Sequence, residues 1–189
     1  PFAVWQADLL DMGPRPGRGR AFRYVLTVVD LFSKYAHGVP LYTKSAREVA
    51  LAMATTFRDG RPRAVQTDNG GEFVNYQFRK VLGNTKHVRS RPYTPQAQGT
   101  VERFNGTLKR HLCSATLKNR GAHWRELLAP FLKFYNTERV HSTTGVVPST
   151  VHDVALRGEA LARVREALER GAQRTRMRSN ERRLPRLRA

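Results

Sequence analysis

Cysteine is nearly absent from this chain, and it contains no long hydrophobic run. Cys113 is the single cysteine, so an internal disulfide cannot form and the sequence fits a reducing compartment. The six histidines are not paired with cysteines at metal-binding intervals, which argues against a zinc site. No apolar run approaches the ~18 residues that a membrane span needs, and no signal peptide is visible. The sequence therefore predicts no membrane segment.

Acidic residues are also scarce, because 15 Asp and Glu stand against 34 Lys and Arg, a formal charge of +19. This excess indicates a polyanionic partner, with nucleic acid as the first candidate and a membrane surface as the second. Residues 170–189 alone hold eight Arg and one acid, Glu181. Such a segment can be a solubilising tail, but its density of arginine favours phosphate contact or nuclear import.

Hydrophobic periodicity predicts one α/β core followed by a basic helical extension. Strands are expected at 2–12, 23–33, 34–41, 63–70 and 86–91, the second and third being antiparallel neighbours. Helices are expected at 45–57, 75–82, 100–117, 122–136 and 150–170. Ser45 and Glu48 match a capping box, and Thr100 matches an N-cap. Pro130 is expected to kink or divide the fourth helix.

Two of the scarce acids stand where metal ligands are common. Asp68 follows a short buried strand, and Glu102 opens a long helix after a loop rich in Pro, Gln and Gly. Oxygen ligands of this kind suit Mg²⁺ or Mn²⁺, which can neutralise charge on the entering and leaving oxygens of a phosphodiester. Each acid also has an ordinary alternative, a turn-forming Asp-Asn-Gly for Asp68 and a solvated first-turn acid for Glu102.

Several motifs recur in a known order. TDNGGEF, PYTPQAQGTVERFNGTLK and YNTERVHSTTGVVPS resemble the catalytic core of retroviral and LTR-retrotransposon integrases, which are RNase H-like polynucleotidyl transferases. WQADLLDM and YVLTVVDLFSKYAHGVPL are most similar to integrases of Maverick/Polinton-type elements. The resemblance covers about residues 4–150 and implies a mixed five-stranded sheet flanked by helices. We therefore expect a catalytic core at 1–150 and a helical, Arg-rich extension at 151–189.

The resemblance also implies a site. The acidic triad of the family falls on Asp8, Asp68 and Glu102, so that the two Asp share one Mg²⁺ or Mn²⁺ ion and one of them completes a second ion site with Glu102. On its own, Asp8 reads as a buried acid that caps a turn. DNA contacts are implied for four further residues, whose alternative is ordinary loop or helix surface: Tyr93, Gln98, Asn105 and Lys109.

Three other acids compete for these roles: Asp11, Asp30 and Glu72. We expect Asp30 to order the turn after its strand, whereas Glu72 is near enough to Asp68 to replace it. The spacing departs slightly from the family, because 33 residues separate Asp68 from Glu102, fewer than is usual. A shortened connection near Gly83 can absorb the difference. The zinc-binding and small barrel domains of the family are not recognisable in this sequence.

The function that the resemblance implies is Mg²⁺-dependent processing of DNA 3′ ends and their transfer into target DNA. A transposase or RNase H-type nuclease of the same fold is one alternative, and a domesticated protein that binds DNA without catalysis is another. The family also implies a homo-oligomer, in which the apolar residues of 122–136 form either a dimer contact or internal core. Its members act in the host nucleus or in virus-like particles.

Overall fold

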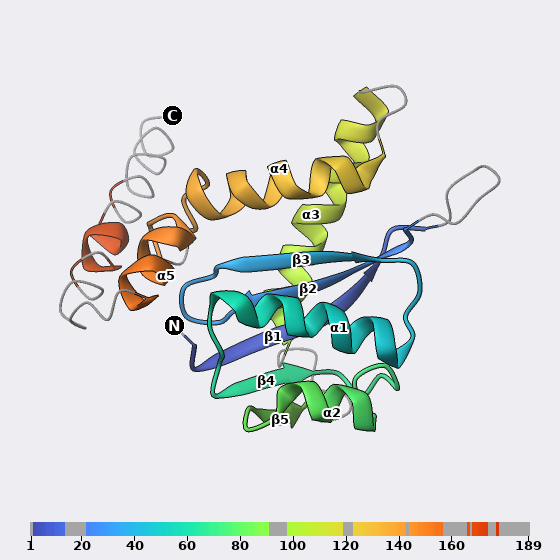
Figure 1. The fold of residues 1–189 in the computed structure, drawn as a ribbon. Helices are drawn as coiled ribbons and strands as arrows, with labels where there is room; N and C mark the ends of the chain where they lie inside the picture. Colours follow the sequence, from blue (N-terminus) through green and yellow to red (C-terminus); the bar gives the residue numbers. More distant parts are fainter. Residues whose placement is uncertain are drawn as a thin grey trace.

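A five-stranded sheet with helices on both faces forms the body of the protein (Figure 1). The computed structural model describes residues 2–13, 22–90, 98–118, 123–142, 144–156, 166, 168–173 and 177. The strands are β1 (Val4–Asp11), β2 (Tyr24–Asp30), β3 (Ala36–Leu41), β4 (Ala64–Thr67) and β5 (Lys86–Arg89). The helices are α1 (Ala46–Thr56), α2 (Tyr76–Leu82), α3 (Gly99–Lys118), α4 (Trp124–Thr137) and α5 (Pro148–Leu156), with a 3₁₀ turn at Phe57–Asp59 after α1.

The strand order is β3-β2-β1-β4-β5, with β1 in the centre. β2 runs antiparallel to both β1 and β3, whereas β4 is parallel to β1 and β5 is parallel to β4. The expected mixed sheet with an antiparallel beginning is therefore confirmed. Because β1 is central, a side chain on it lies beside both the antiparallel and the parallel half.

Each face of the sheet has its own hydrophobic core. α1 and α2 cover one face, and α3 and α4 cover the other (Figure 1). Successive strand residues point to opposite faces, so Leu26 packs with Met53 of α1, while Val25 packs with Leu108 of α3. The alternation in β2 thus supplies both cores, and every residue of this strand after Tyr24 is buried.

Two helix starts differ from the expectation. Ser45 caps α1 and accepts a hydrogen bond from Glu48 N–H, but the Glu48 carboxylate accepts from Thr43 rather than from Ser45 N–H. The capping box is therefore only half formed, since Thr43 offers two donors to Glu48. Thr100 is not an N-cap, because α3 already begins at Gly99.

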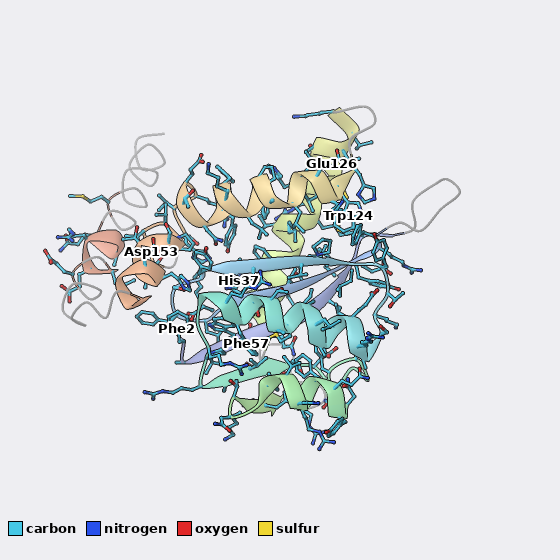
Figure 2. All side chains as sticks on the ribbon, in the orientation of Figure 1. Phe2, His37, Phe57, Trp124, Glu126 and Asp153 are labelled. Carbon is cyan, nitrogen blue, oxygen red and sulfur yellow. The ribbon has the colours of Figure 1, made fainter. Side chains whose placement is uncertain are left out.

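α4 is one continuous helix despite Pro130 in its interior. Pro130 is exposed, so the carbonyl that loses its helical partner can bond to water. Four side chains of α4 are buried in the core shared with α3, which confirms the internal alternative for them: Trp124, Leu128, Phe131 and Tyr135. Figure 2 shows Trp124 at the start of α4, close to α3.

The expected boundary at residue 150 falls within α5, which begins at Pro148. Val151 and His152 are buried, and the His152 ring stacks on Tyr35 with 3.9 Å between centroids. Phe2 lies beside the same ring at 5.1 Å (Figure 2). The start of α5 is thus packed on the sheet. Within the part of the chain that the structure describes, none of the helices combines the length and apolar character that crossing a membrane requires.

Candidate active site

The carboxyl ends of β1 and β4 bring Asp8 and Asp68 to matching positions. These strands are parallel, and Gln6 on β1 pairs with Gln66 on β4. Their side chains meet directly, because Gln6 Nε2 donates to Gln66 Oε1 at 3.1 Å. Asp8 and Asp68 each follow two residues later, so alternation directs them to the same face of the sheet as the glutamines. Neighbouring strands lie about 5 Å apart, and continuing the register two residues past Gln6 and Gln66 sets Asp8 opposite Asp68, in agreement with the effect of the Asp68 charge on Asp8.

Asp8 is the more enclosed of the two acids. Its Oδ1 accepts from Leu9 N–H at 2.8 Å, and its Oδ2 accepts from Asn105 Nδ2 at 2.8 Å. Burial raises the pKa of Asp8 above its ordinary value of 3.8, the bonds from Leu9 and Asn105 oppose this, and the negative charges of Asp68 and Glu102 raise the pKa further. Asp68 and Glu102 are therefore both close enough to Asp8 to act on it electrostatically.

Asp68 begins a tight turn in which a second acid lies close by. Its Oδ1 accepts from Gly70 N–H at 2.9 Å. A Cβ at Gly70 would lie 2.9 Å from Glu72 Oε2 and 3.1 Å from Asp68 Oδ1, so a larger residue here would force these carboxylates to shift. Asp68 itself is exposed. The competitor expected from the sequence, Glu72, is thus placed beside Asp68 by this turn.

α3 is joined to β1 by three hydrogen bonds along one of its faces. Gln6 Oε1 accepts from Val101 N–H at 3.2 Å, Asn105 donates to Asp8, and Lys109 Nζ donates to the carbonyl of Asp11 at 3.2 Å. Glu102 lies in the first turn of the same helix and is exposed. Its position fixes a carboxylate near the end of β1, next to the favourable N-terminal dipole of α3.

The four predicted DNA contacts are placed differently from one another. Lys109 is exposed, whereas Asn105 and Gln98 are each 7% exposed. Gln98 donates to Ser90 Oγ at 3.1 Å, so its amide braces the segment before α3. Tyr93 lies outside the described residues. Among the competing acids, Asp30 orders its turn as expected by accepting from Phe32 N–H and Ser33 N–H, and Asp11 pairs with Arg23.

A glutamine and serine network under the site was not predicted. Gln6 bonds to Gln66, Gln66 Nε2 donates to Ser90 Oγ, and Gln98 reaches the same hydroxyl. These bonds tie β1, β4 and the segments around β5 and α3 together beneath the acids. The alternation of polar residues in strands 4–11 and 64–67 is the signal that could have indicated it, since Gln6, Asp8 and Gln66 share one face.

The donor chemistry of the site fits a hard divalent cation. Among the described residues, no three His, Cys, Asp or Glu side chains gather closely enough to ligate a single ion. Mg²⁺, however, needs only one or two carboxylates and takes its other oxygens from water and substrate phosphate. The Asn105 Oδ1 atom is buried without a hydrogen-bond partner. It belongs to the same amide whose Nδ2 donates to Asp8, so it lies close to that acid. A metal-bound water is a suitable donor for it.

Known proteins resemble the chain in sequence. An integrase core domain model matches residues 1–95, and a second integrase core domain model matches residues 84–148. The Pol polyprotein of feline endogenous virus ECE1 is 31% identical over 134 residues, which are 68% of this chain and 12% of the polyprotein. The chain thus spans about a tenth of the length of that relative.

Solved structures resemble it in fold. The simian T-cell lymphotropic virus intasome in complex with PP2A regulatory subunit B56 gamma contains a chain with a TM-score of 0.71 and 23% identity, covering 80% of this chain and 54% of that one. The HTLV-2 integrase catalytic core domain in complex with magnesium, in its trimeric form, has a TM-score of 0.66 and 22% identity. The match covers 80% of this chain and 97% of that one.

The fold is therefore that of a retroviral integrase catalytic core, an RNase H-like architecture. The chain belongs to the integrase core domain family.

Proposed function

We propose that this chain is the catalytic core of an integrase that processes the 3′ ends of element DNA and joins them to target DNA. The observation that carries the proposal is the register of β1 and β4, which sets Asp8 beside Asp68 in a protein of the integrase core family. Glu102 supplies the third carboxylate from α3. In the joining step, a 3′-hydroxyl oxygen forms a bond to a target phosphorus, and the target P–O3′ bond breaks. The attacking hydroxyl loses its proton and the leaving oxygen gains one.

Each of the named residues has a proposed part in this reaction. Asp8 and Asp68 would hold one divalent cation, and Glu102 with one of them would hold a second. When bound, Mg²⁺ or Mn²⁺ polarises the phosphate and lowers the pKa of an attacking hydroxyl. Asn105 positions the Asp8 carboxylate by donating from Nδ2 to Asp8 Oδ2, while Asp8 Oδ1 accepts from Leu9 N–H. Lys109, Tyr93 and Gln98 are proposed to contact DNA near the acids.

The setting of the reaction is proposed from the family. The solved relatives include an intasome and a trimeric integrase core, and we propose that this chain likewise acts on DNA as a homo-oligomer. The curated relative is a retroviral polyprotein, so we propose that the chain acts in virus-like particles and then in the host nucleus. The Arg-rich residues 151–189 are proposed as a separate extension that contacts phosphates, with the core at 1–150.

The test is a joining assay with a labelled DNA duplex that has a recessed 3′ end and a supercoiled plasmid as target. The wild-type chain should insert the duplex in the presence of Mg²⁺ or Mn²⁺. Asp68→Asn should lower the rate of joining about a thousandfold, because a bound metal contributes several kcal/mol of transition-state stabilisation. Undiminished joining by this variant would remove Asp68 from the mechanism.

Glu72→Gln is the matched control, since Glu72 lies beside Asp68 in the same turn. It should join DNA at nearly the wild-type rate, whereas Glu102→Gln should fail. Loss of activity in Glu72→Gln but not in Glu102→Gln would reverse the two assignments. Nicking of the plasmid without joining would favour the nuclease alternative.

A further inference from the structure

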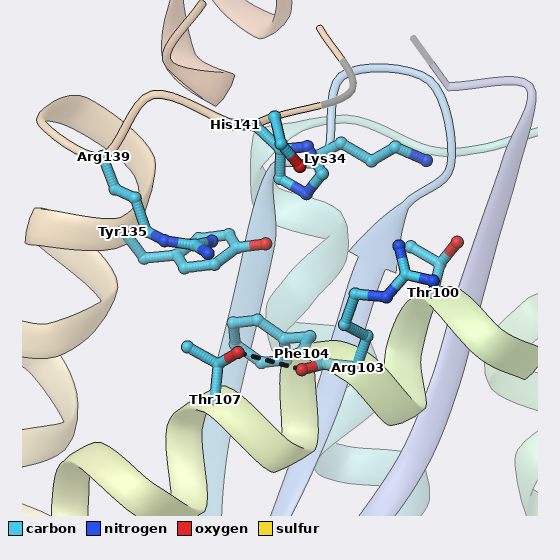
Figure 3. Close-up of a pocket in the computed structure, with 9 residues that line it drawn as sticks. Lys34, Thr100, Arg103, Phe104, Thr107, Tyr135, Arg139 and His141 are labelled. Carbon is cyan, nitrogen blue, oxygen red and sulfur yellow. Dashed lines mark hydrogen bonds between the residues drawn. The ribbon is translucent and has the colours of Figure 1, made fainter. Parts of the chain in front are cut away.

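A small cavity lies on the face of α3 that is turned away from the acids. Its volume is about 60 Å³, and it is enclosed by the turn after β2, the first turns of α3, the end of α4 and the segment that follows α4 (Figure 3). Charged and hydroxyl groups make up most of its polar lining: Lys34, Thr100, Arg103, Thr107, Tyr135 and Arg139. His141 and Ser142 close the remaining side.

Positive charge in this cavity is not balanced by nearby acids. Lys34, Arg103 and Arg139 line it, and no Asp or Glu stands among its described lining residues. The ion pairs found among the described residues, Arg23 with Asp11 and Arg170 with Glu166, lie elsewhere. Asp30 is the acid whose negative charge raises the pKa of Lys34. Its two oxygens already accept from the backbone of its own turn and from Phe2 N–H and Trp5 Nε1.

The behaviour of His141 reflects the same excess of charge. Burial, followed by the charges of Lys34, Arg139 and Arg103, lowers the pKa of His141 to about 4. The imidazole is therefore neutral at physiological pH, and no acid stands beside the three cations among the described residues that line the cavity. Burial and Arg103 also lower the pKa of Lys34. An anion in the cavity would relieve the mutual repulsion of these groups.

The cavity is also rich in hydrogen-bond donors. Lys34 Nζ uses one of its three N–H donors on the carbonyl of Leu31 at 2.6 Å. Arg103 presents a guanidinium from an exposed helix position, and the Arg139 guanidinium lies over the Tyr135 ring at 5.1 Å. The volume is several times that needed for one water. Planar guanidinium groups and an ammonium around such a space suit the oxygens of a phosphate.

The cavity and the acids lie on opposite sides of α3. Glu102, Asn105 and Lys109 lie on the side that faces β1, whereas Thr100, Arg103 and Thr107 lie on the side that faces the cavity, about half a helical turn away. We propose that this cavity binds a backbone phosphate of DNA that lies against the protein, on the side of α3 turned away from the acids. The proposal rests on the proposed function, and it assigns Lys34, Arg103 and Arg139 to positioning DNA rather than to catalysis.

The test measures binding of a fluorescein-labelled DNA duplex by anisotropy, in EDTA and over a range of NaCl concentrations. Arg103→Gln/Arg139→Gln should weaken binding about tenfold and lower the slope of log K against log [NaCl] by about two, one for each phosphate-contacting cation. Arg47→Gln/Arg58→Gln is the matched control, because both arginines are exposed on and after α1, on the opposite face of the sheet. It should change the slope far less.

A second measurement separates a DNA phosphate from a free one. In protein with isotope-labelled histidine, the His141 ring resonances should move on addition of the duplex as well as of inorganic phosphate. Movement with phosphate alone, together with equal DNA binding by the two double variants, would make the cavity a free-anion site and overturn the proposal. No movement with either probe would also overturn it, leaving a solvent-filled cavity.

Thermal melts check that each variant is folded. If the double variant does not fold, Arg103→Gln alone replaces it, because Arg103 is exposed. This single substitution should lower the salt slope by about one, and an unchanged slope would count against the proposal. Since EDTA removes the metal, failure here leaves the joining reaction intact. Failure of Asp68→Asn to lose joining would instead refute the proposed function and leave DNA binding unchanged.

Discussion

The Asp8 carboxylate is largely buried, and keeping it charged there lowers the free energy of unfolding. Its pKa is raised above 3.8, first by burial and then by Asp68 and Glu102. Below 3.8 the carboxyl is protonated in folded and unfolded chains alike, so it costs nothing. As the pH rises through the raised pKa, the folded chain must accept a charge that water would solvate better, so this group lowers the free energy of unfolding at neutral pH.

We therefore expect Asp8→Asn to raise the melting temperature by a few degrees at pH 7 in metal-free buffer. The gain should fade as the pH falls toward 3.8, because the wild-type carboxyl is then neutral as well. Mg²⁺ or Mn²⁺ should stabilise the wild type and not the variant, because the bound cation offsets the repulsion. Differential scanning calorimetry at several pH values checks this, with exposed Asp153→Asn as the control. An equal or lower melting temperature for Asp8→Asn at pH 7 without metal would contradict the account.

Side-chain environments were harder to predict than positions. The motif order located Asp8, Asp68 and Glu102, but Asn105 was expected on a polar, DNA-facing surface and is 7% exposed against Asp8. Helical spacing shows that residues share a face, but it does not show what packs on that face. In this protein, β1 packs on the face of α3 that carries Asn105, and this contact can be known only from the order of the strands in the sheet.

At the scale of elements, one side chain of α4, that of Asn136, hydrogen-bonds to the edge strand β3. Asn136 Nδ2 donates to the carbonyl of Ala36 at 2.9 Å, and its Oδ1 accepts from Ala36 N–H at 3.0 Å. The amide thus satisfies the two outward backbone groups of β3 as a neighbouring strand would. Both bonds are buried, so removing them leaves two backbone groups without partners.

Asn136→Ala should lower the free energy of unfolding by about 2–4 kcal/mol, at about one to two kcal/mol for each of the two unpaired buried groups. For a chain of this size the melting temperature should fall by roughly 5–10 °C. Thermal or urea unfolding measures the change. Asn84→Ala, at an exposed turn position, is the control and should have little effect. If the two variants melt alike, the bridge contributes nothing.

Element types were predictable because their local signals agree with the fold. Ser45, Asn75 and the alternation in β2 all match what the structure forms. Two details differ from the expectation. Pro130 does not divide α4, since it is exposed and the carbonyl that it leaves unpaired can bond to water, and α3 begins one residue before Thr100, where Val101 N–H donates to Gln6 Oε1 on β1.

For the whole molecule, charge and topology act together. The formal charge of +19 is expected to attract DNA without regard to its sequence, and the sheet order brings Asp8 of β1 near Asp68, which follows β4. A carboxylate pair in a strongly basic chain is an effective place for a cation and an adjoining phosphate. The composition could predict the partner class, but only long-range strand pairing could show where the acids meet.

The most direct test of the central claim is a crystal structure of the protein soaked with Mn²⁺, read by anomalous scattering. The account predicts a peak between the carboxylates of Asp8 and Asp68, at metal–oxygen distances of about 2.0–2.2 Å. A Mn²⁺ ion held by Asp68 and Glu72 without Asp8, or no ion at Asp8 at all, would contradict it.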